Sequence, residues 1–96
     1  MTRPTPDDLK HDADALTWWQ GLVADTEDVY ARVPADGLRM DSSLRDELGI
    51  DSIGLISVFY AVIDCFGLDL DEVEAANWAH VGDVVAFARR CAQVAA

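Results

Sequence analysis

Basic residues are scarce in this sequence. Lysine and arginine together number 7, against 18 aspartate and glutamate residues, so the 96-residue chain carries a net charge of -11. A protein that binds nucleic acid or an anionic membrane surface needs the opposite balance, so both kinds of partner are excluded. We expect its protein partners to present basic patches instead.

Long apolar runs are lacking too. No stretch approaches the roughly 20 residues that cross a membrane, and acidic residues stand near the N-terminus where a signal peptide would be apolar. We therefore expect a cytoplasmic protein without a membrane segment.

The residues that usually build metal and catalytic centres are few. Cys65 and Cys91 lack the paired spacing of a zinc or redox motif, so free thiols are expected. His11 lies within a predicted helix and His80 beside a predicted helix cap, and no triad pattern surrounds either. We expect no metal site and no catalytic residue, which leaves a serine enzyme as a weak alternative.

The length of 96 residues suits one domain with a modest core. Residues 1–8 contain two prolines and are expected to form a flexible tail, followed by a single domain over residues 9–94. Apolar spacing predicts a first helix from Asp7 or Asp8 to Val33, ended by Pro34. Trp18 and Trp19 cannot both face the core, so one should be partly exposed, and Gly21 suggests a close contact between helices.

A long connection follows, from Pro34 to Asp51. Within it Ser43 to Leu48 is predicted to form a short turn that places Leu44 and Leu48, four residues apart, on the core, with Asp41 or Ser43 as a local cap. Asp41 and Ser42 form an Asp-Ser pair that precedes this polar turn rather than an apolar helix.

The second Asp-Ser pair, Asp51 and Ser52, stands where a loop passes into an apolar helix predicted over Ser52 to Phe66. Asp51 suits the N-cap position because its carboxylate can accept from the free amides of the first turn. Ser52 then lies exposed in that turn. The same amides and the helix dipole favour a phosphate on its oxygen, so the site is suited to a phosphodiester.

The segment Leu48-Gly49-Ile50-Asp51-Ser52-Ile53, with Ser43-Leu44-Arg45-Asp46-Glu47 before it and Val81-Gly82-Asp83 after it, resembles the acyl carrier protein family. The likeness runs from about Asp41 to Arg90. It implies an all-α, four-helix bundle with a long first loop and a short third helix. It also implies that Ser52, supported by Asp51, receives phosphopantetheine from coenzyme A.

The resemblance implies a carrier of the discrete type, expected to be a monomer, that holds an acyl or aminoacyl group as a thioester. Its partners would be a phosphopantetheinyl transferase and an acyl-loading enzyme, acyltransferase or ketosynthase. The single lysine and the Ala- and Asp-rich composition favour polyketide, antibiotic or related specialised metabolism. The alternatives are a peptidyl carrier of nonribosomal peptide assembly and an adaptor of the same fold that is never modified.

The predicted helix after Ser52 departs from its family because Asp64 is its only acidic residue after the start. It carries two apolar stripes, and a bundle helix needs one. We predict that the second stripe docks partners and consists, with Asp64, of Ile53, Ile56, Tyr60 and Ile63. The alternative is that Tyr60 and Ile63 complete the core.

The remaining helices follow from local signals. Gly67 suits a helix C-cap, and Leu68 to Ala76 fits a short third helix capped by Asp69, with Val73 and Trp78 pointing inward. Where the family often has Thr-Val-Gly-Asp, this chain has His80-Val81-Gly82-Asp83, so His80 is expected in a neutral capping role. Arg89 and Arg90 are expected near the C-terminal end of the last helix dipole.

Overall fold

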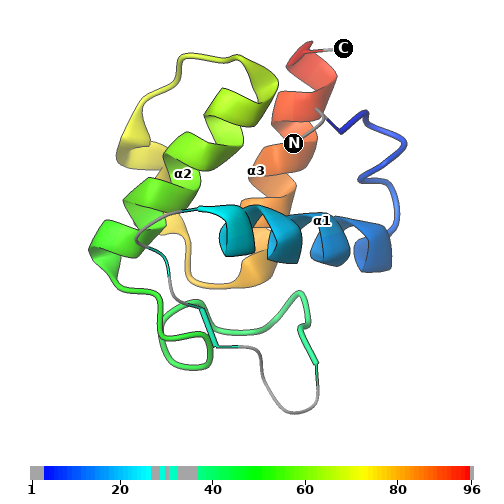
Figure 1. The fold of residues 1–96 in the computed structure, drawn as a ribbon. Helices are drawn as coiled ribbons and strands as arrows, with labels where there is room; N and C mark the ends of the chain where they lie inside the picture. The colour runs from blue at the N-terminus through cyan, green and yellow to red at the C-terminus, as the bar shows by residue number, and fades with distance from the viewer. Residues whose placement is uncertain (1–3, 27–28, 30, 33–36, 96) are drawn as a thin grey trace.

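The structure, a computed structural model, describes residues 4–26, 29, 31–32 and 37–95. These residues form α1 (Asp12–Asp25), α2 (Ser52–Phe66), the 3-10 helix η1 (Glu72–Asn77) and α3 (Val81–Ala95). Helices α2 and α3 lie side by side, α1 lies across both, and η1 packs against α2 (Figure 1). The predicted all-α four-helix bundle is confirmed. Within the described residues no helix has the length and apolar character needed to cross a membrane.

Helix α1 is shorter than predicted. Thr5 and Asp8 close their own turn, in which the Thr5 amide donates to Asp8 Oδ2 at 2.8 Å, and the Leu9 carbonyl accepts from Arg89 Nε of α3 at 2.7 Å. The chain is thus anchored to the core before the helix begins at Asp12. At the other end the Thr26 hydroxyl donates to the Leu22 carbonyl, and α1 stops at Asp25. The predicted helix end, Val33 and Pro34, lies outside the described residues.

The core joins all four helices through aromatic and aliphatic side chains. Trp19 of α1 is buried and Trp18 is half-buried, as their adjacency predicted. Phe59 of α2 packs against Trp78 and Phe87, with ring centroids 6.0 and 5.5 Å apart. The predicted close contact at Gly21 is wrong, because outside its own helix a Cβ there would meet no heavy atom of the described residues within 4 Å.

The connection before α2 is bonded to the start of α3. The carbonyls of Ser42 and Met40 accept from the Val81 and Gly82 amides at 3.0 and 2.7 Å, and the Leu44 amide donates to the Ala79 carbonyl. Leu44 and Leu48 are buried, as predicted, and so is Ile50. The loop that leads to Ser52 is therefore part of the packed domain.

The third helix differs from its prediction in type, cap and facing. It is a 3-10 helix whose N-cap is Asp71 rather than Asp69, with the Asp71 carboxylate accepting from the Val73 amide. Val73 is 62% exposed, which contradicts its expected inward position. With three residues per turn, Ala75 and Trp78 share the buried face and Val73 lies on another.

Helix α3 begins with half of the expected capping box. Asp83 Oδ2 accepts from the backbone amides of Ala79 and His80 at 2.9 Å, and these bonds hold the pKa of Asp83 below its usual value. Arg89 and Arg90 do not occupy the last turn. They reach sideways instead, Arg89 to Asp12 at 2.8 Å and Arg90 to Glu74 at 3.5 Å.

Candidate functional site

Ser52 is the first residue of α2 and is exposed. Gly49 has a φ of 73°, which few side-chain-bearing residues adopt, and it lets the loop turn toward the helix. Asp51 is the N-cap, as predicted, with its Oδ1 accepting from the Gly54 amide at 2.7 Å. The predicted pair thus lies where first-turn amides and the positive end of the helix dipole favour an anion.

Arg45 completes this site, and sequence reasoning did not identify it. Its Nη2 donates to Ser52 Oγ at 3.0 Å. Arg45 comes from the turn over residues 43–48, which is fixed because Ser43 Oγ accepts from the Asp46 amide and because Leu44 and Leu48 are buried. A sequence signal existed, since no other lysine or arginine occurs between Arg39 and Arg89.

The bond from Arg45 also bears on whether Ser52 could be a catalytic nucleophile. Such a serine needs a neighbouring base to take its proton. A guanidinium has only donors, so Arg45 cannot act as that base. Among the described residues the recorded hydrogen-bond partner of Ser52 Oγ is this cation, an arrangement suited to binding an anion.

Ser52 opens onto a groove of about 520 Å³ between α2 and η1. Its walls are mostly apolar, with two acidic side chains, one basic side chain and the Ser52 hydroxyl: Arg45, Ser52, Leu55, Ile56, Asp71, Glu72, Val73, Ala75, Ala76 and Trp78. A second hollow of about 250 Å³ adjoins Ser52 and is lined by Arg45 and by residues 49–52. These surroundings fit phosphopantetheine, because a reachable hydroxyl, donors for a phosphate and a groove for a flexible arm occur together.

The residues of α2 that the sequence predicted for docking are exposed, with one exception. Ile53, Ile56 and Tyr60 are 74%, 38% and 44% exposed, and Asp64 is exposed as well. Ile63 is only 3% exposed, so its side chain belongs to the core and is not offered to a partner. Two stripes of equal apolar character left that choice open until the packing of α2 was known.

Tyr60 links the docking stripe to the rim of the groove. Its hydroxyl donates to Glu72 Oε2 of η1 at 2.8 Å. This bond and the negative charge of Glu72 raise the pKa of Tyr60 above its usual value. The phenol is therefore held as a donor across α2 and η1.

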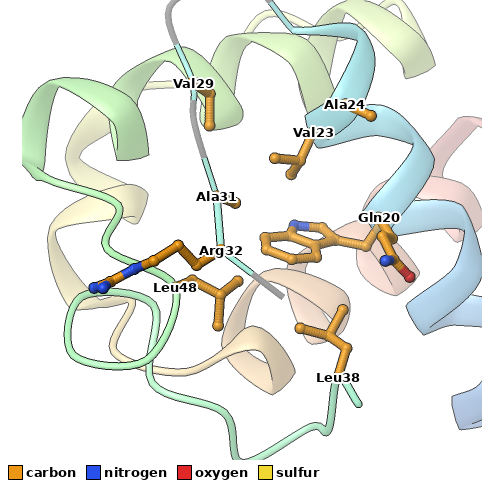
Figure 2. A pocket seen from close by; sticks show the side chains of 9 residues that line it. Gln20, Val23, Ala24, Val29, Ala31, Arg32, Leu38 and Leu48 are labelled. Carbon is orange, nitrogen blue, oxygen red and sulfur yellow. The ribbon is translucent and has the colours of Figure 1, made fainter. Parts of the chain in front are cut away.

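A separate apolar pocket of about 310 Å³ lies between α1 and the connection to α2. Val23, Val29, Leu38 and Leu48 are among its walls, and Arg32 lies along one side (Figure 2). Trp19 also lines it, and its indole N–H has no hydrogen-bond partner among the described residues. None of the predicted site residues lies in this pocket.

Ser42 and Cys91, which also carry potentially reactive groups, are buried. Ser42, the second serine of an Asp-Ser pair, is fully buried, and its Oγ accepts from the Arg39 amide at 3.0 Å. Neither Cys65 nor Cys91 is bonded to another cysteine of the described residues. Burial raises the pKa of Cys91. Within the described part of the chain no three His, Cys, Asp or Glu side chains gather as they would around a metal ion.

Comparison with known proteins finds acyl carrier proteins among the relatives of this chain. An "Acyl carrier protein" of Clostridium acetobutylicum is 33% identical over 55 residues, which are 57% of this chain and 71% of that protein. An "Acyl carrier protein" of Beutenbergia cavernae is 31% identical over 55 residues, 57% of this chain and 67% of that protein. No family model matches the chain.

Proposed function

We propose, because this chain belongs to the acyl carrier protein family, that it carries acyl or aminoacyl groups on a phosphopantetheine arm attached to Ser52. The observation that carries the proposal is the placement of Ser52, exposed at the start of α2 and hydrogen-bonded by Arg45. When attached, the arm supplies a thiol that holds the cargo as an activated thioester.

The attachment needs an external enzyme, because Ser52 Oγ is hydrogen-bonded by the Arg45 guanidinium and, among the described residues, by no carboxylate or imidazole that could take its proton. As the Ser52 Oγ–P bond forms, the pyrophosphate P–O bond of coenzyme A breaks and the adenosine bisphosphate half leaves. The hydroxyl proton passes to a base of the phosphopantetheinyl transferase, since Arg45 cannot accept it. Asp51 holds the first turn of α2 in place, which keeps Ser52 at the surface.

The protein is a carrier and not an enzyme in this proposal, and it works in the cytoplasm as a monomer. The context we infer is polyketide or related specialised metabolism, because α2 has only Asp64 as an acidic residue after its start. Its further partners are then an acyl-loading enzyme, an acyltransferase or a ketosynthase. A peptidyl carrier would differ in its cargo and not in its attachment site.

Intact mass after incubation with coenzyme A and a broad-specificity transferase tests the attachment. We expect one phosphopantetheine on the native protein and on Ser42→Ala, and none on Ser52→Ala. No gain on the native protein would favour the unmodified adaptor. A gain on Ser52→Ala would move the site elsewhere.

We infer that partners dock on the α2 stripe of Ile53, Ile56, Tyr60 and Asp64, where apolar surface is exposed beside Ser52. Tyr60→Glu should raise the apparent KM of loading on the order of tenfold, because a charge would replace an apolar contact. Tyr60→Phe keeps that contact and should load like the native protein. Val94→Glu makes a similar change at an exposed site on α3 and serves as the control. An unchanged KM for Tyr60→Glu would remove the stripe as the docking face.

A further inference from the structure

Within the described part of the chain Arg45, like Lys10 and Arg32, forms no ion pair with a carboxylate, although the protein is acidic. Among the described residues Arg39 pairs with Asp41 and Glu47, Arg89 with Asp12, and Arg90 with Glu74. The guanidinium of Arg45 takes part in none of these pairs and donates to Ser52 Oγ. A neutral hydroxyl is a modest acceptor for such a group, whereas phosphate oxygens match its planar fork of donors.

The geometry points to Arg45 as the residue that binds the phosphate joining the prosthetic arm to Ser52, an inference that rests on the proposed function. With Nη2 3.0 Å from Oγ, the guanidinium lies within reach of a phosphate on Oγ, and it has further N–H donors to offer. Arg45 also lines both hollows that adjoin Ser52. The phosphate would thus lie between the Arg45 guanidinium and the first turn of α2.

The backbone around Arg45 is fixed before any phosphate arrives. The Leu44 amide donates to the Ala79 carbonyl, the Ile50 amide donates to the Leu44 carbonyl, and the Leu48 amide donates to the Ser43 carbonyl. Buried Leu44 and Leu48 hold the turn on the core. Phosphate binding therefore costs little backbone conformational entropy, although the exposed Arg45 side chain must still be restrained.

The negative charge around Ser52 gives the positive charge of Arg45 an electrostatic role. Asp51, Asp71 and Glu72 adjoin Ser52 or line its groove, so a phosphodiester adds a negative charge to an acidic surface. Arg45 is the cationic side chain that lines these two hollows and offsets that charge. It also favours one position of the phosphate, and hence the point from which the arm enters the groove.

The test compares melting temperatures of the apo and phosphopantetheine-loaded forms of the native protein, Arg45→Gln and Arg39→Gln. The second variant removes the same charge from a nearby loop position. We expect the change in Tm on loading to be more positive by on the order of 2–4 °C in the native protein than in Arg45→Gln, at low salt. Arg39→Gln should keep the native change, and about 0.5 M salt should remove most of the difference.

The Tm and loading measurements distinguish a structural role of Arg45, phosphate binding and transferase recognition. A purely structural role for Arg45 would lower Tm equally in both forms, and an unchanged Tm difference on loading would overturn the phosphate inference. Slower loading of Arg45→Gln without a Tm effect would assign Arg45 to transferase recognition and overturn it as well. Failure of the native protein to load would overturn the proposed function together with this inference.

A second measurement does not depend on loading the variant. In the native protein the side-chain N–H resonance of Arg45 should shift downfield on loading, because a charged acceptor replaces a hydroxyl. Its assignment comes from its loss in apo Arg45→Gln. A resonance that stays in place would contradict phosphate binding even if Arg45→Gln could not be loaded.

Discussion

Asp41-Ser42 and Asp51-Ser52 are the same dipeptide in one connection, yet Ser42 is fully buried and Ser52 is exposed. Asp41 bonds Arg39 in the surface loop, while Asp51 caps α2 through the Gly54 amide. The dipeptide alone therefore does not determine whether its serine is exposed. Exposure follows where the aspartate begins a helix, because the cap places the next residue in an exposed first turn.

The two serines also differ in what their polar groups do. Ser42 uses its hydroxyl and its carbonyl internally, with the Arg39 and Val81 amides as donors. Ser52 Oγ accepts from a long side chain that can move with it. Ser42 thus links the loop to α3 through hydrogen bonds, whereas Ser52 is accessible to an enzyme.

Gly82→Ala should give the larger effect, because it strains the contact that holds the Ser42 loop on α3. A Cβ at Gly82 would lie 2.9 Å from the Met40 carbonyl oxygen, a backbone atom that accepts from the Gly82 amide. We expect a loss of about 1–3 kcal/mol in the free energy of unfolding, measured by urea denaturation. Faster hydrogen exchange at the Val81 amide should accompany it.

Gly21→Ala is the matched control, since outside its own helix a Cβ there meets no atom of the described residues within 4 Å. It should stabilise α1 by up to about 1 kcal/mol through helix propensity. If both variants were equally stable, the Ser42 loop would not be held by this close approach, and the contrast between the two serines would lose its structural basis.

The features predicted correctly from the sequence depend on single residues whose local structural role has few alternatives. Asp51 before an apolar helix and Gly67 after it are end signals that hold in most contexts, and the Gly67 φ of 66° agrees. Leu44 and Leu48 needed only their spacing in a short turn. In each case the determining interaction lies within a few residues of the chain.

The features that sequence missed depend on distant packing. The start of α1 follows from Arg89 reaching the Leu9 carbonyl. Ile63 is buried and Val73 exposed because of how α2 and a 3-10 helix meet, which apolar spacing does not specify. Arg45 reaches Ser52 because the turn between them folds back, so their contact could not be deduced from their spacing alone.

Replacing Asp51 or Asp41 should have a smaller effect on the free energy of unfolding, and the effect should differ between the two. Asp51→Ala removes the acceptor of the Gly54 amide and a negative charge at the positive end of α2, and should cost about 1 kcal/mol of unfolding free energy. Asp41→Ala removes an ion pair whose carboxylate side chain is 82% exposed and should cost less than about 0.5 kcal/mol. Urea denaturation of both variants measures the difference.

Asp51→Asn sharpens this test because asparagine also caps helices but carries no charge. If the cap is what presents Ser52, Asp51→Asn should keep most of the native stability and loading rate, while Asp51→Ala loses both as the first turn of α2 frays. Asp41→Ala should load at the native rate. Equal loading by Asp51→Ala and Asp41→Ala would mean that the exposure of Ser52 does not depend on the cap, and that the turn bearing Arg45 is sufficient to present it.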